Sequence, residues 1–173
     1  LLGIEGLDQA FVHPPEWYDE HEVDLRLGAP ATGIDLDGRT VTTDEGLIGY
    51  DRLLIATGSS PRRLPVADDS GAPVSYLRTM EDSRRLKAAL EPGRRIVIVG
   101  GGWIGLEVAA AARTAECEVV VLEALDLPLV RVLGPEVAEV FRALHAEHGV
   151  DDPTNASVPA QPTRDRHAVV GLA

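Results

Sequence analysis

The apolar positions of residues 94–123 change period twice, and this change predicts a strand, a helix and a second strand. Ile96 to Val99 is a short run of β-branched residues, as a strand buried on both faces requires. Residues 103–114 are rich in alanine and favour a helix. Glu118 to Leu122 is again mostly apolar and β-branched. These elements in this order are typical of a βαβ unit, whose two strands are parallel.

The first half of the chain has shorter, alternating segments and predicts a small antiparallel β-meander. The second proline of Pro14-Pro15 favours a short helix over residues 16–22. Asp37-Gly38 is a tight hairpin signal between two of the extended segments. The predicted strands cover residues 23–27, 31–36, 40–43, 47–48 and 51–56.

Helical spacing returns in two further places. Thr79 is a good N-cap with Asp82 three residues later, which predicts a helix through Leu90. The segment before it, residues 61–73, is rich in Pro, Arg, Asp and Gly and predicts a linker or an exposed crossing.

The second helix is expected after an irregular stretch that ends at Gly134. Apolar residues recur at helical spacing from Glu136 to His148, with Gly149 as C-cap. His145 and His148 are three residues apart, but without a third ligand in view a solvated helix end is favoured over a metal pair. Residues 151–173 contain three prolines and no lasting period, which predicts an irregular tail.

The turn after the first strand of the βαβ unit fits the pattern G-x-G-x-x-G. Gly100 allows a tight turn, Gly102 lets the backbone approach a pyrophosphate, and Gly105 lets the helix pack closely on the sheet. Trp103 and Ile104 complete the turn, where the helix N-terminus directs free N–H groups towards an anion. A glycine motif alone is weak support, but here a strand precedes it and a helix follows it. The pattern predicts a dinucleotide site.

An acidic residue completes this fingerprint and indicates which dinucleotide is bound. Glu123 follows the second strand, 18 residues after Gly105, close to the spacing of roughly 20 for a ribose-binding carboxylate. Such a carboxylate accepts hydrogen bonds from a ribose 2′-hydroxyl and repels a 2′-phosphate. Residues 124–126 include no arginine to neutralise a phosphate. NAD is therefore favoured over NADP.

Composition excludes several other classes of protein. The chain has 173 residues, with 28 acidic against 16 basic side chains and a net charge of −12, which disfavours nucleic acid and anionic membranes as partners. No apolar run approaches the length of a membrane span. Cys117 is the one cysteine, so no disulfide framework forms within the chain, and a packed, inert thiol is expected in a reducing, cytoplasmic compartment.

Several segments together resemble a known family. They are Tyr50 to Gly58, the glycine turn with Glu107 and Glu123, and residues 76–79 together with 131–137. They are similar to the flavoprotein pyridine nucleotide–disulfide oxidoreductases, in particular the ferredoxin (rubredoxin, putidaredoxin) reductase branch. The resemblance implies an α/β fold that is part of a flavoprotein reductase with two Rossmann-like dinucleotide-binding domains, one for FAD and one for NAD. Residues 1–93 would then be the later part of the first FAD segment, 94–150 the first half of the NAD domain and 151–173 the irregular tail.

The resemblance also implies roles for individual residues. Thr57 and Gly58 match a loop that meets the flavin dinucleotide, and Arg78 matches an arginine that contacts FAD. Ala31 takes the place of a valine whose backbone faces the adenine, and Glu107 matches a helix glutamate near the nicotinamide. The N-terminal FAD glycine motif does not occur in these 173 residues, so we expect this chain alone to bind FAD weakly or not at all.

The implied reaction passes electrons from NADH through FAD to a ferredoxin-type iron–sulfur protein. The cofactors carry this chemistry, and no catalytic side chain or metal ligand is expected. One alternative is an NADH oxidase or disulfide reductase of the same superfamily. Another is a non-catalytic remnant that at most binds NAD.

Overall fold

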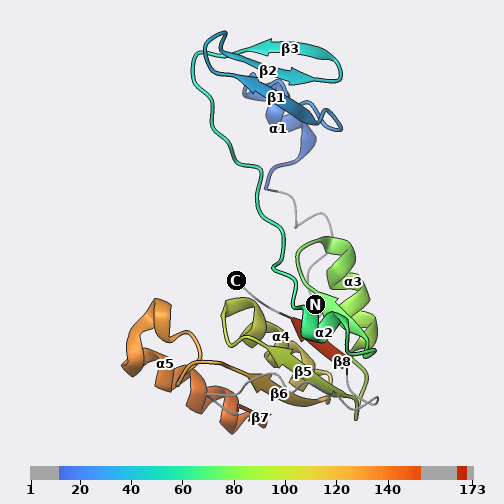
Figure 1. The fold of residues 1–173 in the computed structure, drawn as a ribbon, viewed down its shortest axis with the longest axis vertical. Helices are drawn as coiled ribbons and strands as arrows, with labels where there is room; N and C mark the ends of the chain where they lie inside the picture. Colours follow the sequence, from blue (N-terminus) through green and yellow to red (C-terminus); the bar gives the residue numbers. More distant parts are fainter. Residues whose placement is uncertain (1–11, 153–166, 171–173) are drawn as a thin grey trace. The chain divides into compact units, whose positions relative to one another are not determined.

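The computed structural model describes residues 12–152 and 167–170, which fall into two compact units that divide between Gly58 and Ser59 (Figure 1). The first unit contains the predicted meander. Its elements are α1 (Pro15–Glu20) and the antiparallel strands β1 (Ala31–Asp35), β2 (Thr40–Thr43) and β3 (Gly46–Gly49), in the order β1-β2-β3. The Asp35 carboxylate accepts hydrogen bonds from the backbone N–H groups of Asp37 and Gly38, at 3.0 and 2.9 Å, and so stabilises the first turn.

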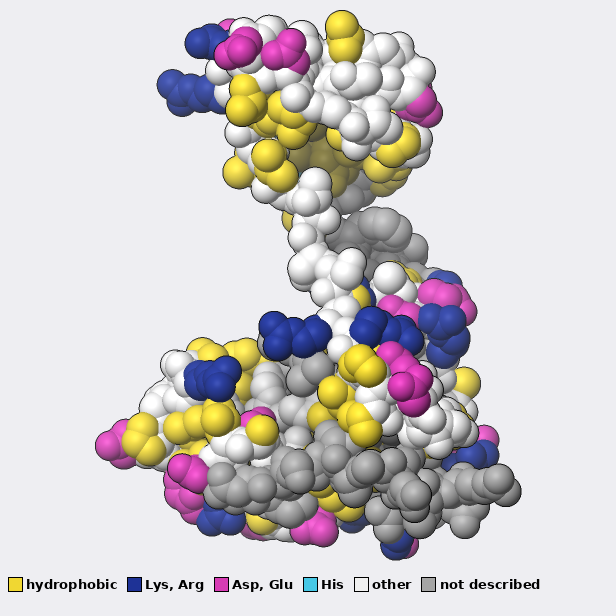
Figure 2. Space-filling view, viewed as in Figure 1, with side chains coloured by type: hydrophobic (Ala, Val, Ile, Leu, Met, Phe, Trp, Pro, Cys, Tyr) yellow, Lys and Arg dark blue, Asp and Glu magenta, His cyan; other side chains and the backbone are white. Residues whose placement is uncertain are grey.

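Two strands predicted for this unit are absent. Residues 23–27 and 51–56 pair with no strand among the described residues, and the Leu54 side chain is 87% exposed. Their predictions were wrong because an apolar or alternating segment becomes a strand only where a neighbour satisfies its backbone. No residue from 12 to 58 is fully buried, and Figure 2 shows apolar side chains at the surface of this unit.

The second unit is built on a five-stranded parallel sheet in the order β4-β8-β5-β6-β7. The predicted strands of the βαβ unit are β5 (Arg95–Val99) and β6 (Glu118–Leu122), aligned with Ile96 opposite Val119. Three further strands were not predicted: β4 (Val74–Tyr76), β7 (Val150–Asp151) and β8 (His167–Val170). They have two to four residues, too few to show a period, and β8 lies within the tail that was expected to be irregular.

The described residues of this unit form the helices α2 (Pro65–Asp68), α3 (Met80–Ala89), α4 (Trp103–Thr114) and α5 (Val130–Glu147). The predicted cap of α3 is confirmed: Thr79 Oγ1 accepts from the Asp82 N–H at 3.1 Å, and Asp82 Oδ2 accepts from the Thr79 N–H at 2.8 Å. Helix α2 lies inside the predicted linker. Helix α5 begins four residues before Gly134, whose φ of 75° kinks it, so the predicted irregular stretch is partly helical.

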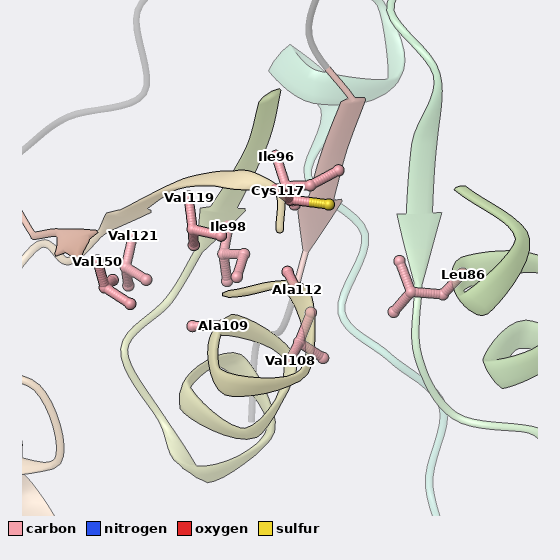
Figure 3. Close-up of a cluster of buried hydrophobic side chains, with 10 residues drawn as sticks. All are labelled: Leu86, Ile96, Ile98, Val108, Ala109, Ala112, Cys117, Val119, Val121 and Val150. Carbon is pink, nitrogen blue, oxygen red and sulfur yellow. The ribbon is translucent and has the colours of Figure 1, made fainter. Parts of the chain in front are cut away.

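The core lies between the sheet and the alanine-rich face of α4 (Figure 3). Ala109 and Ala112 are fully buried there, and their small side chains let the helix come close to the strands. Cys117 is also fully buried, and its thiol donates to the Glu91 carbonyl at 3.3 Å, as expected of a packed thiol; burial raises its pKa. The remaining members of this cluster are Leu86, Ile96, Ile98, Val108, Val119, Val121 and Val150.

Gly105 fixes the closest approach between α4 and the sheet. A Cβ atom at this position would lie 2.0 Å from the carbonyl oxygen of Gly100, a backbone atom that cannot rotate away. The third glycine of the motif is therefore required by packing, as predicted.

We expect Gly105→Ala to lower the free energy of unfolding of the second unit by about 3 kcal/mol or more, because α4 must move off the sheet. Urea unfolding followed by circular dichroism measures this. Gly49→Ala is the matched control, since nothing lies within 4 Å of a Cβ there. Equal stability of Gly105→Ala and the unmodified chain would contradict the packing argument.

Arg113 joins three segments of the second unit. From α4 its Nε donates to the His148 carbonyl at the end of α5, at 2.9 Å, and its Nη1 donates to the Cys117 carbonyl that precedes β6. Hydrogen bonds from a charged donor to backbone carbonyls are stronger than neutral ones.

Arg113→Met is expected to destabilise this unit by about 1–2 kcal/mol through the loss of both bonds. Arg84→Met should cost much less, because the ion pair that Arg84 makes with Glu81, at 3.7 Å, is exposed. The two midpoints of urea unfolding give the comparison. Equal losses in the two variants would show that Arg113 does not join the segments.

Candidate functional site

The glycine turn lies at the carboxyl end of β5, where the order of the strands reverses. Beyond β5 the chain continues to β6 and β7 on one side, whereas β8 and β4 lie on the other. In open parallel sheets such a reversal leaves a crevice at the carboxyl ends of the strands, where ligands bind. The topology thus directs a ligand to the turn that the sequence singles out.

The turn leaves the N-terminus of α4 free to meet an anion. Gly100 has a φ of 102°, and its N–H donates to the Leu122 carbonyl at 2.9 Å, which continues the β5–β6 pairing into the turn. Gly102 is the N-cap of α4 and provides no side-chain cap, and the first turn holds no acidic residue. Helix α3, by contrast, has a complete capping box and two acidic residues in its first turn. The amide groups and dipole of α4 are therefore available to a phosphate group.

Glu123 lies at this turn, as its predicted role requires. Its Oε2 accepts from the Gly101 N–H at 2.7 Å, and its Oε1 accepts from the Leu125 N–H at 2.8 Å. A carboxylate oxygen has more than one acceptor position, so both oxygens can still accept from ribose hydroxyls. The carboxylate thus holds the backbone of the turn and keeps acceptor positions for a further donor.

Gly101 is a site residue that the motif did not single out. A Cβ there would lie 2.9 Å from Cβ of Pro128 and 3.0 Å from Glu123 Oε2, so a side chain would push the carboxylate away. The Gly101 carbonyl in turn accepts from the Leu129 N–H at 3.0 Å. The run of three glycines was the available signal, because G-x-G-x-x-G leaves the second of them unexplained.

Trp103 and Ile104 begin α4 at the mouth of the turn, and they are 45% and 36% exposed. The indole ring of Trp103 packs edge-on against Phe141 of α5, with centroids 5.6 Å apart. Phe141 therefore supports the indole ring from one side, while much of the Trp103 surface stays exposed. Glu107 lies further along α4 and is exposed.

The residues expected to contact FAD are divided between the two units. Ala31, Thr57 and Gly58 belong to the first unit and are exposed. Arg78 belongs to the second unit, where its Nε donates to the Ser59 carbonyl at 2.8 Å. Their roles in FAD binding stay predictions.

The described part of the chain also bears on metals and membranes. Among residues 12–152 and 167–170, no three His, Cys, Asp or Glu side chains are grouped so as to hold a metal ion. Within those ranges no helix combines the length and the apolar character needed to cross a membrane.

Comparison with known proteins gives a consistent family. The family model described as pyridine nucleotide-disulphide oxidoreductase matches residues 6–171. The ferredoxin–NAD(+) reductase component of the anthranilate 1,2-dioxygenase system of Burkholderia cepacia is 41% identical over 151 residues, which are 87% of this chain and 37% of that protein. Putidaredoxin reductase of Pseudomonas putida is 37% identical over 162 residues, or 91% of this chain and 38% of that one.

A solved structure agrees with these relatives. In the crystal structure of the covalent putidaredoxin reductase–putidaredoxin complex, a chain superimposes with a TM-score of 0.83 and 32% identity, over 98% of this chain and 46% of that one. The chain spans less than half the length of each of these relatives. Because the family match covers nearly all of it, and the glycine turn and Glu123 lie together at the reversal of the sheet, this chain belongs to the pyridine nucleotide–disulphide oxidoreductases.

Proposed function

We propose that the second unit binds NAD(H) at the glycine turn, within a reductase that passes electrons from NADH through FAD to a ferredoxin-type iron–sulfur protein. The observation that carries the proposal is the hydrogen bond from the Gly101 N–H to Glu123, which holds a carboxylate beside an uncapped helix N-terminus. The pyrophosphate would lie on the amides of the turn, and the ribose of the adenosine half on Glu123.

Charge at this end of the sheet favours NAD over NADP. Glu123 presents a negative charge where NADP would place its 2′-phosphate, and residues 124–126 bring no cation. In this proposal the second unit binds the pyrophosphate through backbone N–H groups, and the charge of Glu123 discriminates NAD from NADP.

The remaining cofactor and the partner are proposed from the relatives. Those described above are named as ferredoxin–NAD(+) reductase components and as putidaredoxin reductase. Thr57, Gly58, Arg78 and the backbone of Ala31 would hold FAD, which supplies the conversion of a hydride into single electrons. Glu107 would lie near the nicotinamide. In the proposal, the residues of this chain bind and orient the two cofactors, and none of them acts as an acid or a base.

We assign residues 1–93 to the first FAD segment and 94–150 to the NAD domain, which β8 from the tail 151–173 completes. The buried, unpaired Cys117 supports a reducing compartment, and we place the protein in the cytoplasm.

NADH binding is expected to quench the fluorescence of Trp103, which is exposed beside the turn. The Trp17→Phe variant isolates this signal, because the chain has two tryptophans and Trp17 belongs to the first unit. In this background Glu123→Gln should weaken NADH binding by about tenfold, through loss of a charged acceptor. Glu118→Gln, at the opposite end of the same strand, should leave the affinity unchanged. No response of Trp103 to millimolar NADH would favour a remnant that does not bind the dinucleotide.

FAD is expected to bind this chain weakly, because the 173 residues contain no second glycine motif that could hold its pyrophosphate. The purified chain should show no flavin absorbance band, and added FAD should keep its free fluorescence. Arg78→Ala should change neither signal. A yellow protein that loses its flavin in Arg78→Ala would instead show that these residues alone hold FAD.

A further inference from the structure

A second carboxylate, that of Asp152, directly follows β7, the strand that pairs with β6. Strands β6 and β7 run parallel with Val150 opposite Val119 and Asp151 opposite Val120. Asp152 is the residue after β7 and Glu123 is the residue after β6, so both carboxylates lie at the carboxyl ends of these parallel strands. Residues two apart in a strand face the same side of the sheet. Val121 and Val150 pack in the core, and they precede Glu123 and Asp152 by two residues. Continued alternation would direct both carboxylates towards that face of the sheet.

The carboxylate of Asp152 is incompletely satisfied where it lies. Its Oδ1 is buried and has no hydrogen-bond partner among the described residues. A buried acceptor without a donor is unfavourable, and such a group is uncommon in a folded protein. Hydrogen bonding among the described residues therefore gives no structural reason for a carboxylate at this position.

The charges around Asp152 are mainly negative. Burial is the largest cause that raises the pKa of its carboxyl group, and the negative charge of Glu123 is the next. Asp151 on the same strand also raises it, and Arg142 of α5 lowers it. Arg142 already forms an ion pair with Glu139 on its own helix. Its positive charge is therefore shared between Glu139 and Asp152. A further negative group brought to this end of β6 would meet both Glu123 and Asp152.

We propose that Asp152 is a second acidic determinant of the adenosine end of the site, which with Glu123 weakens the binding of a dinucleotide that carries a 2′-phosphate. This inference rests on the proposed function, because it requires the dinucleotide to lie at the glycine turn. The negative charge of Asp152 repels the 2′-phosphate, so Asp152 influences the choice between NADH and NADPH without taking part in the reaction.

The test compares NADH and NADPH in the full chain with Trp17→Phe, and it follows Trp103 fluorescence. Asp152→Asn should tighten NADPH binding by about threefold to tenfold, as expected for removal of one charge at this range, and should change NADH binding less than about twofold. Asp151→Asn removes the same charge one residue away, from an exposed position on the opposite side of the strand, and should have little effect on either ligand. Equal NADPH affinities in Asp152→Asn and Asp151→Asn would overturn the inference.

A pH series separates a charge effect from a change in structure. The Asp152 carboxyl group has a raised pKa, so its charge is present above that pKa and is lost as the pH falls through it. The advantage of Asp152→Asn over the parent in NADPH binding should therefore shrink as the pH is lowered from neutrality. An advantage that stays constant over the series would contradict a role through charge. If neither dinucleotide binds the parent, the proposed function fails and this inference fails with it; if NADH alone binds to all variants, only this inference fails.

Discussion

The hydrogen bond between the Gly101 N–H and the Glu123 carboxylate connects the two strands on which the site is built. It is 2.7 Å long and joins the residue after the first glycine to the residue after β6. The carbonyl of the same glycine is held by the Leu129 N–H, so the turn is fixed on both of its polar sides. The geometry allows no side chain at Gly101 and none at Gly105. The chemistry of the site therefore depends on the absence of side chains as much as on the presence of a carboxylate.

The elements that the sequence predicted well are those whose pattern is enforced locally. Strands β5 and β6 contain short uninterrupted apolar runs, helix α4 is rich in alanine, and a glycine turn joins β5 to α4. The cap of α3 requires only Thr79 and Asp82. Glu123 was also predicted, because its spacing from the turn follows from the length of one helix and one strand. Gly101 was missed, since its requirement comes from Pro128, which reaches the turn only in the folded chain.

The failures have a common physical cause in pairing between distant segments. Residues 51–56 have the composition of a buried strand, yet they lie exposed because no described strand pairs with them. Conversely, β8 comes from a segment with no clear period and becomes a strand because both of its neighbours, β4 and β5, accept its backbone. The β-propensity of a segment shows only that it can form a strand, and pairing with neighbouring strands determines whether it does. The roles assigned to Ala31, Thr57, Gly58 and Arg78 depend on the family and not on a local pattern, which is why they remain predictions.

The place of β8 has a consequence for how the chain acquires its structure. Ile96 of β5 aligns with His167, a partner 71 residues later in the sequence. As the chain emerges from the ribosome, β5, α4 and β6 can assemble early through nearby contacts, but the other edge of β5 stays open until β8 is synthesised. An open apolar edge recruits strands from other molecules, so a nascent chain interrupted before residue 167 is exposed to aggregation. Synthesis at low temperature or with a chaperone that shields this edge should raise the yield of correctly folded protein.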